Sequence, residues 1–226
     1  MKYGKFLPEN GTIGFVAPSF GCNIEPYKSA FENAQKVWTK EGYSLSLGPN
    51  VYEGCGIGIS NTPEKCAQEF NEWYEKEDVD VLISCGGGEL MCEILPYVDF
   101  EKIRQEEPKW FMGYSDNTNL LFLLATLCDT AGIYGPCAAA FGMEPWHESL
   151  KTTIFRFQKE EFLPIVHRLV VFKPFLTSAM PFLWQSRWGS SGLQSIVSTT
   201  FLYTFLSNPT VTFSIAASSQ PKHNPQ

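Results

Sequence analysis

The sequence predicts an α/β protein in which a parallel sheet is built from strands that alternate with helices. Short apolar runs of strand length recur along the first 135 residues, and each is followed by a turn of small or polar residues. The segments between them carry apolar residues three and four positions apart, which is the period of a helix with one buried face. Strands and helices in this order favour right-handed crossovers and ligand binding at the carboxyl ends of the strands.

The first strand is predicted at residues 12–16, where an apolar run ends in Ala17-Pro18-Ser19. A helix follows, because apolar side chains recur at helical spacing from Tyr27 to Trp38, and Gly42 stands where a left-handed helix cap is needed. Residues 43–47 then alternate between apolar and small polar side chains, which indicates a half-buried strand.

The second helix is predicted to begin at Thr62 as N-cap with Pro63 in the first helical position. Its expected apolar face consists of Cys66, Phe70, Trp73 and Tyr74. Residues 79–84 form the next predicted strand. The loop Gly86-Gly87-Gly88 follows it, and then a helix that runs from Leu90 and is stopped by Pro96.

A third unit repeats this order. Residues 110–112 are a short apolar strand, residues 113–116 a turn, and residues 117–128 a helix so rich in leucine that we expect it to be buried nearly all round. The pattern continues to about Gly135. The predicted fold is therefore a Rossmann-like or flavodoxin-like domain.

Charge divides the chain into two unequal parts. Residues 1–161 hold 13 Lys/Arg and 24 Asp/Glu, whereas residues 162–226 hold four Lys/Arg and neither kind of acidic residue. The later part also has ten serines and six prolines and keeps neither the strand nor the helix period. We therefore expect an α/β domain over residues 1–158 and an irregular tail over 159–226, such as a frame-shifted, truncated or poorly folded segment would give.

Composition excludes several classes of protein. An acidic α/β domain is unsuited to a phosphate backbone, so no nucleic-acid partner is expected. The seven cysteines include no Cys-x-x-Cys pair, which leaves neither a disulfide framework nor a zinc cluster and favours reduced thiols in the cytoplasm. The N-terminus lacks the apolar stretch of a signal peptide, and polar residues interrupt every long apolar run in the tail, so no membrane span is expected.

The strongest chemical signal is Ser115, which lies on the predicted turn between a strand and a helix. Such a turn holds a serine hydroxyl clear of the sheet and directs the first helix amides into the same space. This arrangement suits a nucleophile whose tetrahedral oxyanion needs donors aimed in advance, and the N–H of Asp116 is one candidate donor. The alternative is that Ser115 and Asp116 only cap the following helix.

A second signal is the glycine loop after Cys85. The glycines permit close backbone approach, so this loop could cradle a phosphate, donate to an oxyanion or simply form a tight turn. It has neither the Lys-Ser/Thr of a Walker loop nor a complete dinucleotide fingerprint. Cys85 itself could be a nucleophile, although a buried structural cysteine is the simpler interpretation. Residues 54–58 are interpreted as a surface loop, and no histidine has a context that marks it as a base.

Five short motifs stand in order along roughly residues 10–150. They are Ile13-Gly14-Phe15-Val16-Ala17-Pro18-Ser19, Cys85-Gly86-Gly87, Leu95-Pro96-Tyr97-Val98-Asp99, Gly113-Tyr114-Ser115-Asp116-Asn117-Thr118 and Tyr134-Gly135-Pro136. Together they resemble the landmarks of the LD-carboxypeptidases, a group of serine peptidases. The resemblance implies Ser115 as nucleophile, with the Asp116 amide and an amide of the Gly86-Gly87 loop as oxyanion hole.

The same resemblance implies hydrolysis of the amide bond to a C-terminal D-residue of a murein tetrapeptide, or of a microcin-like peptidyl-nucleotide, without metal or cofactor. It also implies a small peptide substrate and a possible homodimer. The family's triad is Ser-Glu-His, with Glu and His in a second, C-terminal domain. This sequence has no acidic residue after Glu161 and only His167 and His223 in its tail, neither in a family context. We therefore expect little or no activity from this chain. The alternatives are an inactive binding or association protein and a Cys85-dependent amidohydrolase.

Overall fold

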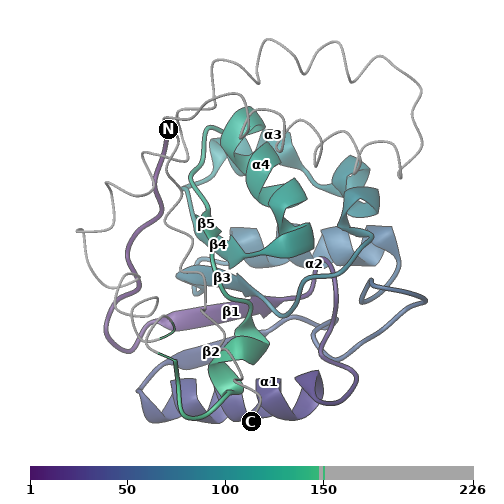
Figure 1. Cartoon of the computed structure of the whole chain (residues 1–226). Helices are drawn as coiled ribbons and strands as arrows, with labels where there is room; N and C mark the ends of the chain where they lie inside the picture. Colours follow the sequence, from purple (N-terminus) through teal and green to yellow (C-terminus); the bar gives the residue numbers. More distant parts are fainter. Residues whose placement is uncertain (148–149, 151–226) are drawn as a thin grey trace, which may run out of the picture.

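The computed structural model describes residues 1–147 and residue 150. The expectations for residues 159–226, and the boundary at residue 158, fall outside the described residues. Within the described part, the chain forms one sheet with helices on both of its faces (Figure 1).

All five strands of the sheet run parallel. They are β1 (Thr12–Val16), β2 (Ser44–Leu47), β3 (Val81–Ser84), β4 (Trp110–Gly113) and β5 (Ile133–Tyr134). Their spatial order is β2-β1-β3-β4-β5, with every neighbouring pair in parallel register. This is the flavodoxin-like order of doubly wound sheets, in which the switch point lies between β1 and β3. The predicted α/β class is confirmed.

Successive side chains of the strands alternate between two hydrophobic layers. Phe15 belongs to one layer and Val16 to the other, and Met112 and Phe111 divide in the same way. The first layer is covered by α1 (Tyr27–Lys40) and the 3-10 helix η3 (Ala138–Gly142). The second is covered by four elements: α2 (Pro63–Glu75), η1 (Met91–Tyr97), α3 (Phe100–Gln105) and α4 (Thr118–Leu127).

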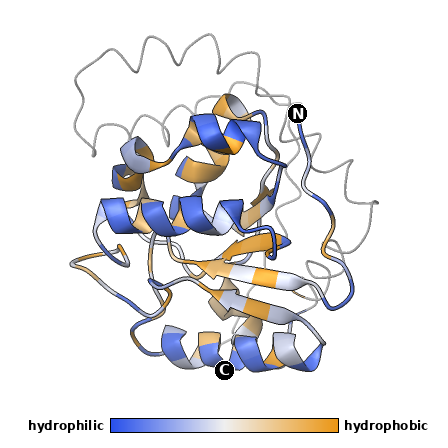
Figure 2. Ribbon diagram, turned by 180° about the vertical axis from the view of Figure 1, so that it is seen from behind, coloured by the Kyte–Doolittle hydropathy of each residue, from blue (hydrophilic) through white to orange (hydrophobic). Residues whose placement is uncertain are grey.

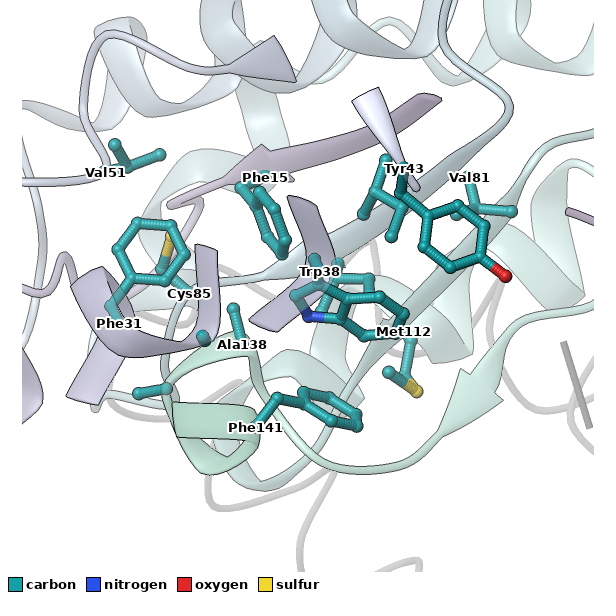
Figure 3. Close-up of a cluster of buried hydrophobic side chains, with 14 of the residues drawn as sticks. Phe15, Phe31, Trp38, Tyr43, Val51, Val81, Cys85, Met112, Ala138 and Phe141 are labelled. Atoms are coloured by element: carbon teal, nitrogen blue, oxygen red, sulfur yellow. The ribbon is translucent and has the colours of Figure 1, made fainter. Parts of the chain in front are cut away.

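Aromatic side chains fill the layer under α1 (Figure 3). The Trp38 ring lies 5.2 Å from Phe141 of η3 and 5.6 Å from Tyr43, centroid to centroid. Phe31 meets Phe15 of β1 edge to face at 5.2 Å. These contacts pack α1 against the sheet and against η3. Figure 2 shows mainly hydrophilic residues on the outer sides of α1 and α2.

Several local predictions are confirmed. Gly42 has a φ of +95°, which is the left-handed conformation expected after α1. Pro63 begins α2, and the predicted apolar face of that helix is buried. Thr62 does precede the helix, but its side chain makes no capping hydrogen bond.

Two helices differ from the predictions. The segment expected as a helix ending before Pro96 is a run of 3-10 turns that continues through Tyr97. Proline has no N–H to donate and its ring clashes with the carbonyl of residue i−4 in an α-helix, so a regular α-helix is disfavoured around Pro96. Helix α4 is not buried all round, because Leu127 is 41% exposed and Phe122 is half-buried. Helix α3 and η3 were not predicted, being too short to show a period.

Candidate active site

Ser115 lies at a sharp turn between β4 and the 3-10 helix η2 (Ser115–Asn117), which continues directly into α4. Its φ is +59°, in the left-handed region that a residue with a side chain rarely adopts. Ser115 is exposed, whereas its neighbours Asp116 and Asn117 are buried. The strained turn therefore presents the serine side chain at the carboxyl end of the central sheet, where ligands bind in open parallel sheets.

The Ser115 side chain does not cap the helix that follows it. Neither η2 nor α4 has a side-chain capping hydrogen bond at its start. Instead, the Thr118 hydroxyl donates to the Ser115 carbonyl oxygen at 2.6 Å. Among the described residues, no side chain forms a hydrogen bond with the Ser115 hydroxyl, so none of them serves as its base in this structure.

The glycine loop after β3 lies against this turn. A Cβ added to Gly87 would be 3.2 Å from the Cβ of Ser115 and 3.5 Å from its Oγ. The neighbouring Gly86 faces another way, because its added Cβ would meet Phe20 at 3.3 Å. Of the two glycines predicted for the oxyanion hole, Gly87 is thus the one whose Cα faces Ser115.

Two backbone N–H groups at this place, those of Gly87 and Asp116, donate to no protein acceptor in the described part of the chain. One group comes from the loop after β3 and the other from the turn that holds Ser115. A pair of N–H groups beside a serine hydroxyl is the arrangement that stabilises a tetrahedral oxyanion.

The Asp116 side chain is 5% exposed and accepts three hydrogen bonds. Its Oδ2 accepts from the Ser19 hydroxyl at 2.7 Å and from the Met91 N–H at 2.9 Å. Its Oδ1 accepts from the Asn119 amide at 3.0 Å. This carboxylate thus joins the loops after β1 and β3 to the turn after β4, and it caps η1 rather than its own helix.

Asn117 is fully buried and had no assigned role in the sequence. Its Nδ2 donates to the Gly86 carbonyl at 2.9 Å and to the Tyr114 carbonyl at 3.1 Å. Its Oδ1 has no hydrogen-bond partner among the described residues, which costs about 1–3 kcal/mol for a buried acceptor. A Cβ added to Gly113 would be 2.7 Å from Asn117 Cγ, so the glycine before the turn leaves the space that this amide occupies.

A buried carboxylate holds the loop after β1 in place. Glu69 of α2 is 1% exposed and accepts from the Ala17 N–H at 2.7 Å and from the Asn50 N–H at 2.8 Å. Burial raises the pKa of Glu69 to about 7, although these hydrogen bonds act in the opposite direction. Glu69 therefore titrates near neutral pH. Its partner Ala17 lies two residues before Ser19, which donates to Asp116.

The other candidates from the sequence have different surroundings. Cys85 is fully buried, and burial raises the pKa of its thiol well above the usual value, which disfavours the reactive thiolate. Residues 54–58 form a tight surface turn in which Cys55 pairs with Ile59. His147 is exposed. No group of three or more potential metal ligands occurs within residues 1–147.

Three exposed tyrosines accompany Ser115 at this edge of the sheet. Tyr114 comes directly before Ser115. Tyr134 of β5 comes directly after Ile133, the residue that pairs with Met112 of β4. Tyr27 stacks edge to face on Phe20, at 5.7 Å between centroids, and Phe20 in turn contacts the glycine loop. The carboxyl edge of the sheet that holds Ser115 therefore also carries solvent-exposed aromatic side chains.

A parallel sheet of flavodoxin-like order with a strained serine at its carboxyl edge defines a class of α/β protein built around a strand–serine–helix turn. Comparison with known proteins gives the family. Residues 13–135 match the model of the LD-carboxypeptidase N-terminal domain. The chain belongs to the LD-carboxypeptidase family.

Relatives and solved structures agree with this membership. A protein of Vibrio cholerae named as a carboxypeptidase is 32% identical over 146 residues, which are 64% of this chain and 43% of that protein. The microcin C7 self-immunity protein MccF of Escherichia coli is 30% identical over 140 residues, 62% of this chain and 40% of MccF. The structure of wild-type MccF without ligand superposes with a TM-score of 0.64 at 27% identity, covering 70% of this chain and 47% of MccF.

A muramoyltetrapeptide carboxypeptidase from Oxalobacter formigenes shares the fold, with a TM-score of 0.53 at 21% identity over 63% of this chain and 46% of that one. The chain spans about two fifths of the length of the curated relatives that it matches. Within residues 1–147, no helix is long and apolar enough to cross a membrane.

Proposed function

We propose that this chain carries the nucleophile and oxyanion site of a serine-type LD-carboxypeptidase. The observation that carries the proposal is the exposed, strained Ser115 beside the free N–H groups of Gly87 and Asp116. In the proposed step, Ser115 Oγ adds to an amide carbonyl, its proton passes to a base, and the two N–H groups bind the oxyanion. The base then gives this proton to the amide nitrogen, so collapse of the intermediate releases a neutral amine and leaves an acyl-serine for water to hydrolyse.

The proposed substrates are peptides that end in a free carboxylate: a murein tetrapeptide with a C-terminal D-residue, or a peptidyl-nucleotide. MccF, to which this chain is similar, has been crystallised with aspartyl sulfamoyl adenosine and with glutamyl sulfamoyl guanosine. One MccF variant in which a serine, an asparagine and a lysine are replaced by alanine is described as an active-site mutant. The exposed tyrosines at the same edge of the sheet as Ser115 offer flat surfaces on which a nucleobase or a peptide can stack.

We further propose that turnover by this chain is slow. The Ser115 hydroxyl has no base among the described side chains, and the sequence has no Asp or Glu after residue 161 to act as the triad glutamate. In a comparable triad, loss of the base alone lowers kcat by about 10⁶. In this proposal the chain supplies the nucleophile, and the general base has to come from a group other than the described side chains.

The test is hydrolysis of an L,D-linked tetrapeptide by the purified 226-residue chain. The measured quantity is the rate at which the C-terminal D-residue is released. We expect a rate close to that of buffer alone. Clear hydrolysis that Ser115→Ala abolishes would overturn the proposed impairment while supporting Ser115 as nucleophile. Hydrolysis that survives Ser115→Ala would overturn the nucleophile assignment.

A further inference from the structure

We propose that Asn117 is a positioning residue that fixes the direction of the Gly87 N–H toward the oxyanion site. The inference rests on the proposed function, because it concerns how the oxyanion donor of that site is held. Asn117 is fully buried, and within the described residues its side chain forms no hydrogen bond with the Ser115 hydroxyl. It would act through the peptide group between Gly86 and Gly87.

The first step of the argument concerns this peptide group. It is flanked by two glycines, so its plane can rotate at little steric cost. An N–H that must be aimed in advance cannot depend on such a backbone alone. Some other contact has to select one orientation of the plane.

The structure holds this peptide group by its carbonyl. The Gly86 oxygen accepts from the Asn117 amide at 2.9 Å and from the Ser84 hydroxyl at 2.9 Å. The next carbonyl, that of Gly87, accepts from the Phe20 N–H at 3.1 Å. The bond between the two glycines is trans, since the cis bonds of the described chain precede Pro26 and Pro145.

In a trans peptide, the C=O and the N–H point in opposite directions. Drawing the Gly86 oxygen toward the buried Asn117 therefore turns the Gly87 N–H away from the protein interior. This N–H has no acceptor among the described residues, and its residue is the one whose Cα faces Ser115. The Asn117 amide, together with the Ser84 hydroxyl, thus sets the direction of this backbone donor.

The Asn117 side chain is itself held in a single orientation. The neighbours of its Nδ2 are acceptors: the carbonyls of Gly86 and Tyr114, and the Cys137 sulfur at 3.6 Å. The NH₂ group must therefore face them. The Oδ1 atom is left buried without a partner. An arrangement that leaves a buried acceptor unpaired serves the geometry of the two loops rather than the stability of the fold.

The test uses the chain with Ser115→Cys and Cys55→Ser. A thiol reacts without the missing base, and Cys55 is the one exposed cysteine within the described residues. Alkylation by iodoacetamide displaces iodide and forms no oxyanion. Acylation by p-nitrophenyl acetate forms the C–S bond through a tetrahedral oxyanion and releases p-nitrophenolate, while the thiol proton passes to the buffer.

The measured quantity is the acylation rate constant divided by the alkylation rate constant at position 115, with the modified site identified by peptide mass spectrometry. Adding Asn117→Ala should lower this ratio about tenfold or more, since losing an oxyanion donor outright costs about 10²–10³. Asn117→Asp, which keeps the size and removes the donor, should act alike. The matched control is Asn33→Ala, because the Asn33 amide also donates to a glycine carbonyl, that of Gly142, at 2.8 Å.

A ratio that stays within twofold after both Asn117 substitutions, in folded protein, overturns the inference. Should neither variant fold, Ser84→Ala removes the other donor to the Gly86 oxygen and must lower the ratio by at least twofold. The proposed function fails separately. In that case the ratio at position 115 with Asn117 intact is no higher than the ratio at Cys55 in the chain without substitutions.

Discussion

The Ser19 hydroxyl donates a hydrogen bond to the Asp116 carboxylate at 2.7 Å across 97 residues of sequence. Ser19 follows β1 and Asp116 follows the serine at the end of β4, so this bond closes the carboxyl edge of the sheet over the strand between them. The same carboxylate oxygen holds the Met91 N–H. The three loops that surround Ser115 are therefore held by one buried side chain.

Replacement of this carboxylate should destabilise the protein. Asp116→Asn replaces one of its two accepting oxygens with an NH₂ group, which would face either the Met91 N–H or the Asn119 amide. We expect the free energy of unfolding to fall by about 1–3 kcal/mol, measured by urea denaturation. Asp99→Asn is the control. Asp99 caps α3 through the Lys102 N–H at 2.9 Å, and Asn caps equally well, so a change below about 0.5 kcal/mol is expected. Equal losses at the two positions would contradict the bridging role of Asp116.

The strained backbone at Ser115 makes a second prediction. Glycine adopts a φ of +59° without the Cβ clash that any other side chain meets. The Ser115→Gly protein should therefore be more stable than the Ser115→Ala protein by about 1 kcal/mol in the free energy of unfolding. At Ser29, on the exposed side of α1, the order should reverse because glycine is the poorer helix former. If the alanine variant is the more stable one at Ser115 as well as at Ser29, the turn is not strained.

The buried Glu69 gives a third prediction, on pH. Because its pKa is raised from 4.5 to about 7, the folded protein binds this proton more tightly than the unfolded chain does. The contribution of Glu69 to stability is thus fully present below pH 4.5, is lost as pH rises toward 7, and is constant above that. The loss is roughly 3 kcal/mol.

Glu69→Gln should remove this part of the pH dependence, measured as the free energy of unfolding between pH 5 and pH 8. Glu72→Gln is the matched control on the same helix, because Glu72 is exposed and, among the described residues, its carboxylate accepts a hydrogen bond only from Gln68. It should keep the slope of the unsubstituted chain. A slope unchanged by Glu69→Gln would contradict the raised pKa of Glu69.

Local pattern was sufficient to predict the sheet and the longer helices. The strands around Phe15, Leu82 and Phe111 are short apolar runs, and α1 and α2 have clear apolar faces, so periodicity alone locates them. The segment after Leu90 shows where this fails. Its apolar spacing fits a helix, but spacing does not distinguish 3-10 turns from an α-helix, and the Met91 N–H is held by a carboxylate 25 residues away.

The site was predictable only in part for the same reason. Ser115 could be found because strand, turn and helix are contiguous in sequence, and the glycine loop because it follows a strand. Asn117 gave no signal, since its partner Gly86 lies 31 residues away and an asparagine at a helix start is ordinary. Which glycine faces the serine depends on the packing of two loops, which no local pattern encodes.

The central claim is that Ser115 is a nucleophile supplied with oxyanion donors but with no base among the described side chains. Labelling of the purified chain by a fluorophosphonate probe, with the site found by peptide mass spectrometry, tests it most directly. We expect labelling at Ser115 before any other serine, faster as pH rises because hydroxide replaces the base, and lost in Ser115→Ala. Absence of labelling at every pH tested, or labelling that Ser115→Ala leaves unchanged, would contradict the account.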